Sequence, residues 1–179
     1  MLGDMKNLLL IGILFWLPVR AHAAAFLTAA DFATDWRISK QFTIAVAQAM
    51  PDSAYDFKAT PEERSFGEQM IHIAASLFQR FSEISGTEPV RSALPKKITK
   101  PFVIEWLNQS FDYVLQVLPG LTDEQLSKAS FKVDFEGRPS PEINGRDMIM
   151  NMFIHVAHHR AQCEVYLRLK GIEPPAYTF

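Results

Sequence analysis

Two histidines, His155 and His159, lie four residues apart in a predicted long amphipathic helix, residues 144–171. Side chains four residues apart lie on the same face of an α-helix, about one turn from each other. Two imidazoles in this arrangement can bind one metal ion, as they do in HExxH metalloproteases. The glutamate base of that motif is missing, because position 156 is Val156. The pair therefore predicts metal binding and leaves the substrate open.

A third histidine, His72, lies on the apolar side of another predicted helix, between two isoleucines. If the two helices pack as neighbours, His72 can face the His155/His159 pair. Three histidine ligands with an open position are typical of catalytic zinc sites. Nickel, iron and manganese also accept imidazole ligands, so the identity of the metal stays open. Water on such an ion can become a nucleophile near neutral pH.

Three further side chains are weaker candidates for orienting the site or touching a substrate. Glu68 lies one turn before His72, but its expected role is to cap the helix. Gln162 shares the face of the histidine pair, and a solvated glutamine is an equal alternative. His158 points about 100° away from its neighbour, so we expect it behind the ligands or at the surface. No catalytic side chain is identified beyond these candidates.

The remaining unusual side chains near the motif are interpreted as structural. Arg160 is expected to make an ion pair, with binding of a substrate anion as the alternative. Cys163 is expected to be a small buried hydrophobe, with a thiolate ligand as the alternative. Large aromatic side chains are expected in the core, namely Trp36, Trp106, Tyr113 and Phe153.

Four predicted helices must position these residues: 26–50, 65–85, 100–118 and 144–171. The first can be capped by Thr28 or Asp31, and the second by a Ser65/Glu68 capping box. Asn144 is expected to cap the last helix. Residues 55–57 are expected to be extended, 122–126 to form a helical turn at best, and 131–136 to form a short strand or extended strap. Four helices with short to medium loops predict an all-α four-helix bundle.

Residues 1–25 have the layout of a secretory signal peptide: Lys6, the apolar run 8–17, and the small-residue pattern Ala21-His22-Ala23. The run is short for a membrane span, which needs roughly 20 residues. An uncleaved anchor and a buried helix are the alternatives. We predict a signal peptide at 1–23, one domain at 24–179, a periplasmic or secreted location, and no stable membrane span after cleavage.

Composition and charge limit the functions and the stabilising interactions that this chain can have. The chain has 179 residues and a net charge of −2, which does not suggest a nucleic-acid partner, since binding of nucleic acid would need a basic face. The length predicts one domain with a sizeable core. The single cysteine excludes an internal disulfide, so an exported chain must depend on its core, its partners or a metal.

Two long motifs carry a resemblance to a known family. They are residues 65–74 (SFGEQMIHIA) and residues 154–162 (IHVAHHRAQ), the second followed by YLR at 166–168 and GIEPP at 171–175. In this order they resemble the DinB/YfiT-like superfamily over about residues 30–179. The family pattern is His, three residues, then His-Arg-Gly-Gln, and Ala161 replaces the glycine here.

The resemblance implies an antiparallel four-helix bundle of up-down-down-up topology, here with a short extended strap before the last helix. It also implies a divalent metal on His72, His155 and His159, with zinc or nickel expected first and manganese or iron as alternatives. Characterised relatives include thiol-dependent transferases and a maleylpyruvate isomerase that uses low-molecular-weight thiols. Export would place this chain where such thiols are scarce.

We therefore expect an exported, metal-dependent hydrolase that acts on an unidentified small molecule, with an ion-bound water as the reactive group. Thiol transfer is the second expectation. A non-catalytic binding bundle with a structural metal is a different class of function, and a core of merely hydrogen-bonded histidines is another. A homodimer is compatible with each of these expectations.

Overall fold

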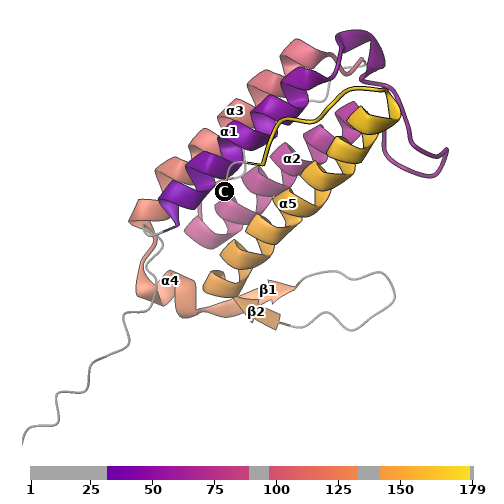
Figure 1. The fold of residues 1–179 in the computed structure, drawn as a ribbon. Coiled ribbons are helices and arrows are strands. Elements are labelled where there is room, and N and C mark those ends of the chain that lie inside the picture. The colour runs from indigo at the N-terminus through magenta and orange to yellow at the C-terminus, as the bar shows by residue number, and fades with distance from the viewer. Residues whose placement is uncertain (1–31, 89–96, 133–141, 178–179) are drawn as a thin grey trace, which may run out of the picture.

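The computed structural model describes residues 32–88, 97–132 and 142–177, and the predicted signal peptide lies outside these ranges. Four long helices form the body of the molecule (Figure 1): α1 (Ala33–Ala49), α2 (Phe66–Ser85), α3 (Lys100–Val117) and α5 (Gly145–Leu169). Three one-turn elements accompany them: the 3₁₀ turns η1 (Asp52–Ala54) and η2 (Leu118–Gly120), and the short helix α4 (Asp123–Ser127). None of the described helices is both long and apolar enough to cross a membrane.

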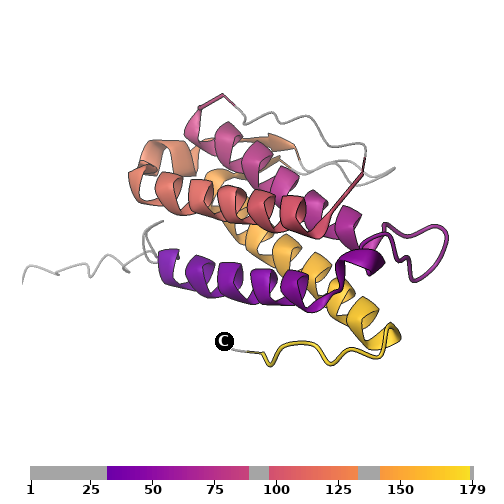
Figure 2. The ribbon, with the colours of Figure 1, turned by 90° about the horizontal axis from the view of Figure 1, so that it is seen from above.

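Hydrogen bonds between helix ends establish the direction of each helix in the bundle. The Lys100 ammonium, at the start of α3, donates to main-chain carbonyls at the end of α1, so α1 and α3 are antiparallel. The hydroxyls of Tyr113, late in α3, and Thr87, just after α2, are bonded, so α2 and α3 are parallel. The Tyr166 hydroxyl, late in α5, donates to the carbonyl of Arg64 before α2. The bundle is therefore up-down-down-up, as expected (Figures 1 and 2).

The start of α2 is fixed by the predicted capping box. The Glu68 N–H donates to Ser65 Oγ at 3.2 Å, and the Ser65 N–H donates to Glu68 Oε2 at 2.6 Å. The bond from the Ser65 backbone is the main cause that lowers the pKa of Glu68. Gly86 ends the helix with φ of 73°, in the left-handed region that favours glycine. Together these residues set the register of the helix that carries His72.

The start of α5 is fixed by a cap and a short hairpin. The Asp147 N–H donates to Asn144 Oδ1 at 2.9 Å, which confirms the predicted cap. Asn144 also ends strand β2 (Glu142–Asn144), which pairs in antiparallel fashion with β1 (Ala129–Lys132). The strand therefore runs directly into the helix that carries His155 and His159. Of the predicted strap at 131–136, residues 131 and 132 belong to β1, and 133–136 lie outside the described residues.

Two of the predicted local conformations differ from the structure. The first helix begins at Ala33, after Phe32, which makes no side-chain cap; Thr28 and Asp31 lie outside the described residues. The prediction that residues 55–57 are extended is wrong for Tyr55 and Asp56, which form a turn after η1, and Tyr55 has helical φ and ψ. The Tyr55 hydroxyl donates to the Ala47 carbonyl at 2.7 Å, so burial of this ring against α1 sets the local backbone.

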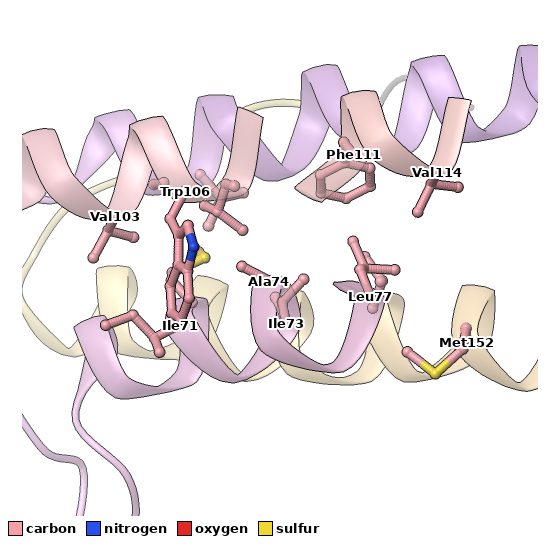
Figure 3. Close-up of a cluster of buried hydrophobic side chains, with 14 of the residues drawn as sticks. Ile71, Ile73, Ala74, Leu77, Val103, Trp106, Phe111, Val114 and Met152 are labelled. Carbon is pink, nitrogen blue, oxygen red and sulfur yellow. The ribbon is translucent and has the colours of Figure 1, made fainter. Parts of the chain in front are cut away.

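Aromatic and aliphatic side chains fill the centre of the bundle. Figure 3 shows Trp106 of α3 reaching toward Ile71 of α2, and Phe111 facing Leu77 one layer further along. Trp36 of α1 is fully buried, with ring centroids 5.4 Å from Phe81 and 5.5 Å from Phe153. The predicted core aromatics are buried or packed against the core, as expected. This core holds α2 and α5 at a fixed separation.

Candidate metal centre

Three imidazole rings from two helices meet at one point between α2 and α5. His72 comes from α2, and His155 and His159 come from consecutive turns of α5. The Nε2 atoms of His72 and His155 lie 3.1 Å apart, and those of His155 and His159 also lie 3.1 Å apart. One nitrogen of each ring lies within 4.8 Å of the other two. The structure thus brings together the three histidines that the sequence motifs single out.

Gln69 fixes the orientation and the tautomer of His159. The Nδ1–H of His159 donates to Gln69 Oε1 at 2.7 Å, and both side chains are buried. With its proton on Nδ1, the neutral ring presents a lone pair at Nε2. Burial raises the pKa of Tyr166, and a hydrogen bond with the Gln69 side chain acts in the opposite direction. Gln69 therefore connects His159 to the tyrosine that joins the end of α5 to the start of α2.

All three imidazoles are held in the neutral form near pH 7. Burial, followed by the charge of His72, lowers the pKa of His155 to about 4. Burial, followed by the charge of His155, lowers the pKa of His159 to about 3. The pKa of His72 is also lowered, by burial first and by nearby Arg64 second. A neutral imidazole is the form that ligates metal ions.

Hydrogen bonds cannot account for all the close contacts among the three rings. His155 Nε2 faces the lone pair of His159 on one side and the Nε2 of His72 on the other. A single proton on this atom serves only one of the two contacts. A cation at the shared point would satisfy all three lone pairs, and two nitrogens on one tetrahedral zinc lie about 3.3 Å apart. The donor set therefore fits a divalent metal ion.

An open groove leads to His72 from the solvent. Its volume is about 470 Å³, and its lining includes His72 together with charged side chains of both signs: Lys58, Glu62, Glu63, Arg64 and Glu68. The Lys58 ammonium lies 3.9 Å from Glu68 Oε2, at the rim of this groove. A small polar molecule can therefore reach His72 from the solvent without any rearrangement of the core.

Comparison with known proteins identifies the family. The family model described as the DinB superfamily matches residues 36–163. This chain belongs to the DinB superfamily. The match includes most of each of the four long helices and all three histidines, so the resemblance carried by the two motifs is confirmed.

Solved structures of DinB-like proteins share the fold of this chain. One from Bacillus subtilis has a TM-score of 0.63 at 21% identity, covering 82% of this chain and 96% of that chain. Another from Bacillus cereus has a TM-score of 0.65 at 19% identity, covering 83% and 96%. No curated protein matches the chain. At these identities the likeness concerns the fold alone.

The weaker candidates lie around the three histidines in this DinB bundle. Glu68 is occupied by the capping box and by Lys58, at the rim of the groove. His158 is exposed, and its ring nitrogen Nε2 lies 3.1 Å from Gln162 Nε2. Gln162 was predicted to lie on the face of the histidine pair, and a hydrogen bond with its side chain acts to raise the pKa of His159, against the larger effect of burial. None of the three side chains shares the meeting point of the imidazoles.

Arg160 and Cys163 have structural positions, as expected. The Arg160 guanidinium is buried, donates to Ser39 Oγ at 3.2 Å, and lies 4.0 Å from Glu164 Oε1. It thereby ties α5 to α1. Cys163 is a free, fully buried thiol, and burial raises its pKa. A protonated, enclosed thiol is a poor metal ligand.

Sequence reasoning missed Gln69 and Arg64 as site residues. Gln69 lies in the motif around His72, and a polar residue at a buried helix position is a signal that it has a specific partner. Arg64 precedes the N-cap of α2, in a stretch where exposed charges are common. Its proximity to the imidazoles depends on how α2 and α5 pair, which spacing along one helix does not show.

We expect Gln69→Met to weaken metal binding by about 10–100-fold, because the Nδ1–H of His159 then loses its acceptor. Gln69→Glu keeps an acceptor at the same place and should restore most of the affinity. Competition with a chromogenic chelator measures all three proteins. Gln79→Met, on the exposed part of α2, is the matched control and should bind as the unmodified chain does. Equal affinity of Gln69→Met and Gln79→Met would show that Gln69 does not position His159.

Proposed function

We propose that this DinB-superfamily chain binds a divalent metal ion through the Nε2 atoms of His72, His155 and His159. The observation that carries the proposal is the convergence of these atoms from two helices, with contacts of 3.1 Å that a proton cannot all satisfy. The lowered pKa values keep the rings neutral. Zinc or nickel is the first expectation, since both accept a purely imidazole donor set.

We further propose that the loaded site is a hydrolase for a small polar molecule. A divalent ion on three imidazoles supplies Lewis-acid chemistry, because it polarises a carbonyl or phosphoryl group and lowers the pKa of water. The groove at His72 gives a substrate access from one side. On the other side, the packed core and the Gln69 bond to His159 exclude water and hold the ligand ring. Thiol transfer is the second candidate within the same family.

A structural metal is the alternative of a different class. His72 and His155 are 83 residues apart in the chain, and an ion between them would fasten α2 to α5. Such an ion binds the folded chain and not the unfolded one, so it stabilises the fold by mass action. The two functions differ in what happens when the ion is removed. If removal of the ion abolishes activity and leaves the fold intact, the ion is catalytic. If removal causes a large loss of stability and no activity is found, the ion is structural.

The first experiment measures metal in the purified chain without a histidine tag. After loading with zinc or nickel and removal of the excess, we expect about one ion per chain by mass spectrometry. A content below about 0.2 ion per chain would contradict metal binding, since a preformed site of three neutral imidazoles should fill. The His72→Ala variant is the control and should fall well below the unmodified chain.

The second experiment distinguishes a catalytic metal from a structural one. His72→Ala and the unmodified chain are compared in thermal melting and against a panel of ester, amide and phosphate substrates. Activity that disappears while the melting temperature changes little supports the hydrolase. A large fall in melting temperature, with neither protein active on the panel, supports the structural metal.

We also propose that the chain is exported and that residues 1–23 are removed. The proposal depends on the order of charged, apolar and small residues in that segment. Sequencing of the N-terminus of exported protein should begin near Ala24. An intact N-terminus that starts at Met1 would contradict cleavage.

A further inference from the structure

The outer face of α5 carries large apolar side chains in contact with solvent. The exposed fractions are 44% for Met150, 60% for Ile154, 51% for Val165 and 58% for Leu169. Two further exposed residues, His158 and Ala161, lie between them. We call these six residues the outer stripe. At 100° per residue they fall within an arc of about 100°, opposite the buried face of the helix.

The outer stripe repeats every 11 residues: Met150 to Ala161, Ile154 to Val165, and His158 to Leu169. A repeat of 11 corresponds to about 3.67 residues per turn, close to the 3.6 of the helix itself. The stripe therefore runs almost parallel to the helix axis over most of α5. A second straight helix can therefore contact the outer stripe along its whole length.

The spacing of the outer stripe reads the same from both ends, with intervals of four, four, three, four and four residues. When two copies of α5 lie antiparallel, this symmetry sets large apolar side chains against each other, Met150 opposite Leu169 and Ile154 opposite Val165, with His158 opposite the small Ala161 near the middle. Every contact then occurs twice, related by a two-fold axis. Such self-complementarity is the requirement of an isologous dimer interface.

The charges at the ends of α5 favour the same arrangement. Asp147 lies in the first turn, Arg168 lies in the last turn, and both are exposed on the side of the stripe. In an antiparallel pair, Asp147 of one copy comes within about one helical turn of Arg168 of the other. A parallel pair would place Asp147 against Asp147 and Arg168 against Arg168. Ala157 and Ala161 near the middle are small, which permits an interaxial distance of about 8–10 Å.

We propose that the outer stripe is the interface of a homodimer in which α5 packs antiparallel against α5 of a second copy. The outer stripe is exposed to solvent in a single copy and becomes buried in the dimer. The two metal centres lie on the flanks of the paired helices, because the imidazoles leave α5 on the side of α2. One helix face is a small interface, so we expect dissociation near the micromolar range.

Sedimentation of the purified chain over about 1–100 μM should show a monomer–dimer equilibrium with no larger species. Ile154→Lys places two charges in the interface and should raise the dissociation constant by roughly 100-fold. Gln116→Lys introduces the same charge on the exposed side of α3 and should leave the equilibrium unchanged. Circular dichroism should show the same helix content for both variants.

Disulfide formation tests the direction of pairing. Ala161 is displaced from the proposed two-fold axis by one and a half residues, so two Ala161→Cys chains should cross-link under mild oxidation. Two copies of Met150 lie 19 residues apart along the paired helices, about 28 Å, so Met150→Cys should not cross-link. The native Cys163 is fully buried and should not contribute.

Three results would overturn the proposal. The first is a monomer throughout the concentration range, whether or not the monomer binds lipid vesicles through the stripe. The second is a dimer that Ile154→Lys leaves intact. The third is cross-linking of Met150→Cys as efficient as that of Ala161→Cys, which would indicate parallel pairing or random collision.

Discussion

Replacement of His159 by alanine is expected to weaken zinc or nickel binding by more than about 100-fold. Loss of a partner behind a ligand alone costs about 10–100-fold, and this change removes the ligand itself. His158→Ala is the matched control one residue away, because its ring is exposed and bonds to Gln162. It should change the affinity by less than about threefold. Calorimetry or chelator competition measures both variants.

His159→Ala also leaves buried Gln69 Oε1 without its donor, which costs about 1–3 kcal/mol of folding stability. His155→Ala is therefore measured as well, since it removes a ligand and keeps the bond between Gln69 and His159. If both variants lose the metal while both keep their helix content, the loss is one of ligation. If both bind as tightly as the unmodified chain, the three histidines are not the metal site.

Replacement of Trp36 by alanine is expected to lower the free energy of unfolding by about 3–5 kcal/mol. The ring is fully buried and packs edge-on against Phe81 and Phe153, with Phe111 at 6.1 Å. This loss is a large part of the roughly 5–15 kcal/mol that stabilises a typical domain. Urea denaturation followed by circular dichroism measures it.

Two further variants test the cause of that loss. Arg37→Ala changes the exposed neighbour of Trp36 on α1 and should shift the free energy of unfolding by less than about 0.5 kcal/mol. The indole Nε1 of Trp36 is buried and has no hydrogen-bond partner in the described structure. Trp36→Phe therefore loses volume and no hydrogen bond, and it should cost less than half as much as Trp36→Ala. Equal losses for Trp36→Ala and Arg37→Ala would contradict the central position of this ring.

The sequence predicted those parts of the fold that depend on local chemistry. The Ser65/Glu68 capping box, the Asn144 cap and Gly86 each act on the backbone within a few residues, so their types and spacing are sufficient evidence. The turn at Tyr55 was predicted wrongly, because a hydrogen bond to α1 and burial of the ring decide its backbone. Local propensity contains no information about such tertiary contacts.

The same distinction applies to the candidate metal centre. The pair His155 and His159 follows from helical periodicity, and His72 was predicted to face it only if α2 packs beside α5. The family resemblance supplied that packing. Gln69 was not predicted to support His159, because their contact spans 90 residues and depends on the rotation of both helices. The outer stripe was likewise not predicted, since apolar residues on both sides of α5 hide which side is buried.

Cys163 makes the opening of the bundle chemically observable. Its sulfur lies 4.0 Å from the Phe66 carbonyl, at the seam between α5 and the first turn of α2. Only a thiolate reacts readily with alkylating reagents, and this thiol is both enclosed and protonated. Its rate of alkylation therefore reports how often α2 and α5 separate transiently in the native state. His72, His155 and His159 span the same contact between α2 and α5. A bound ion would therefore favour the closed state, and alkylation of Cys163 would require the open state.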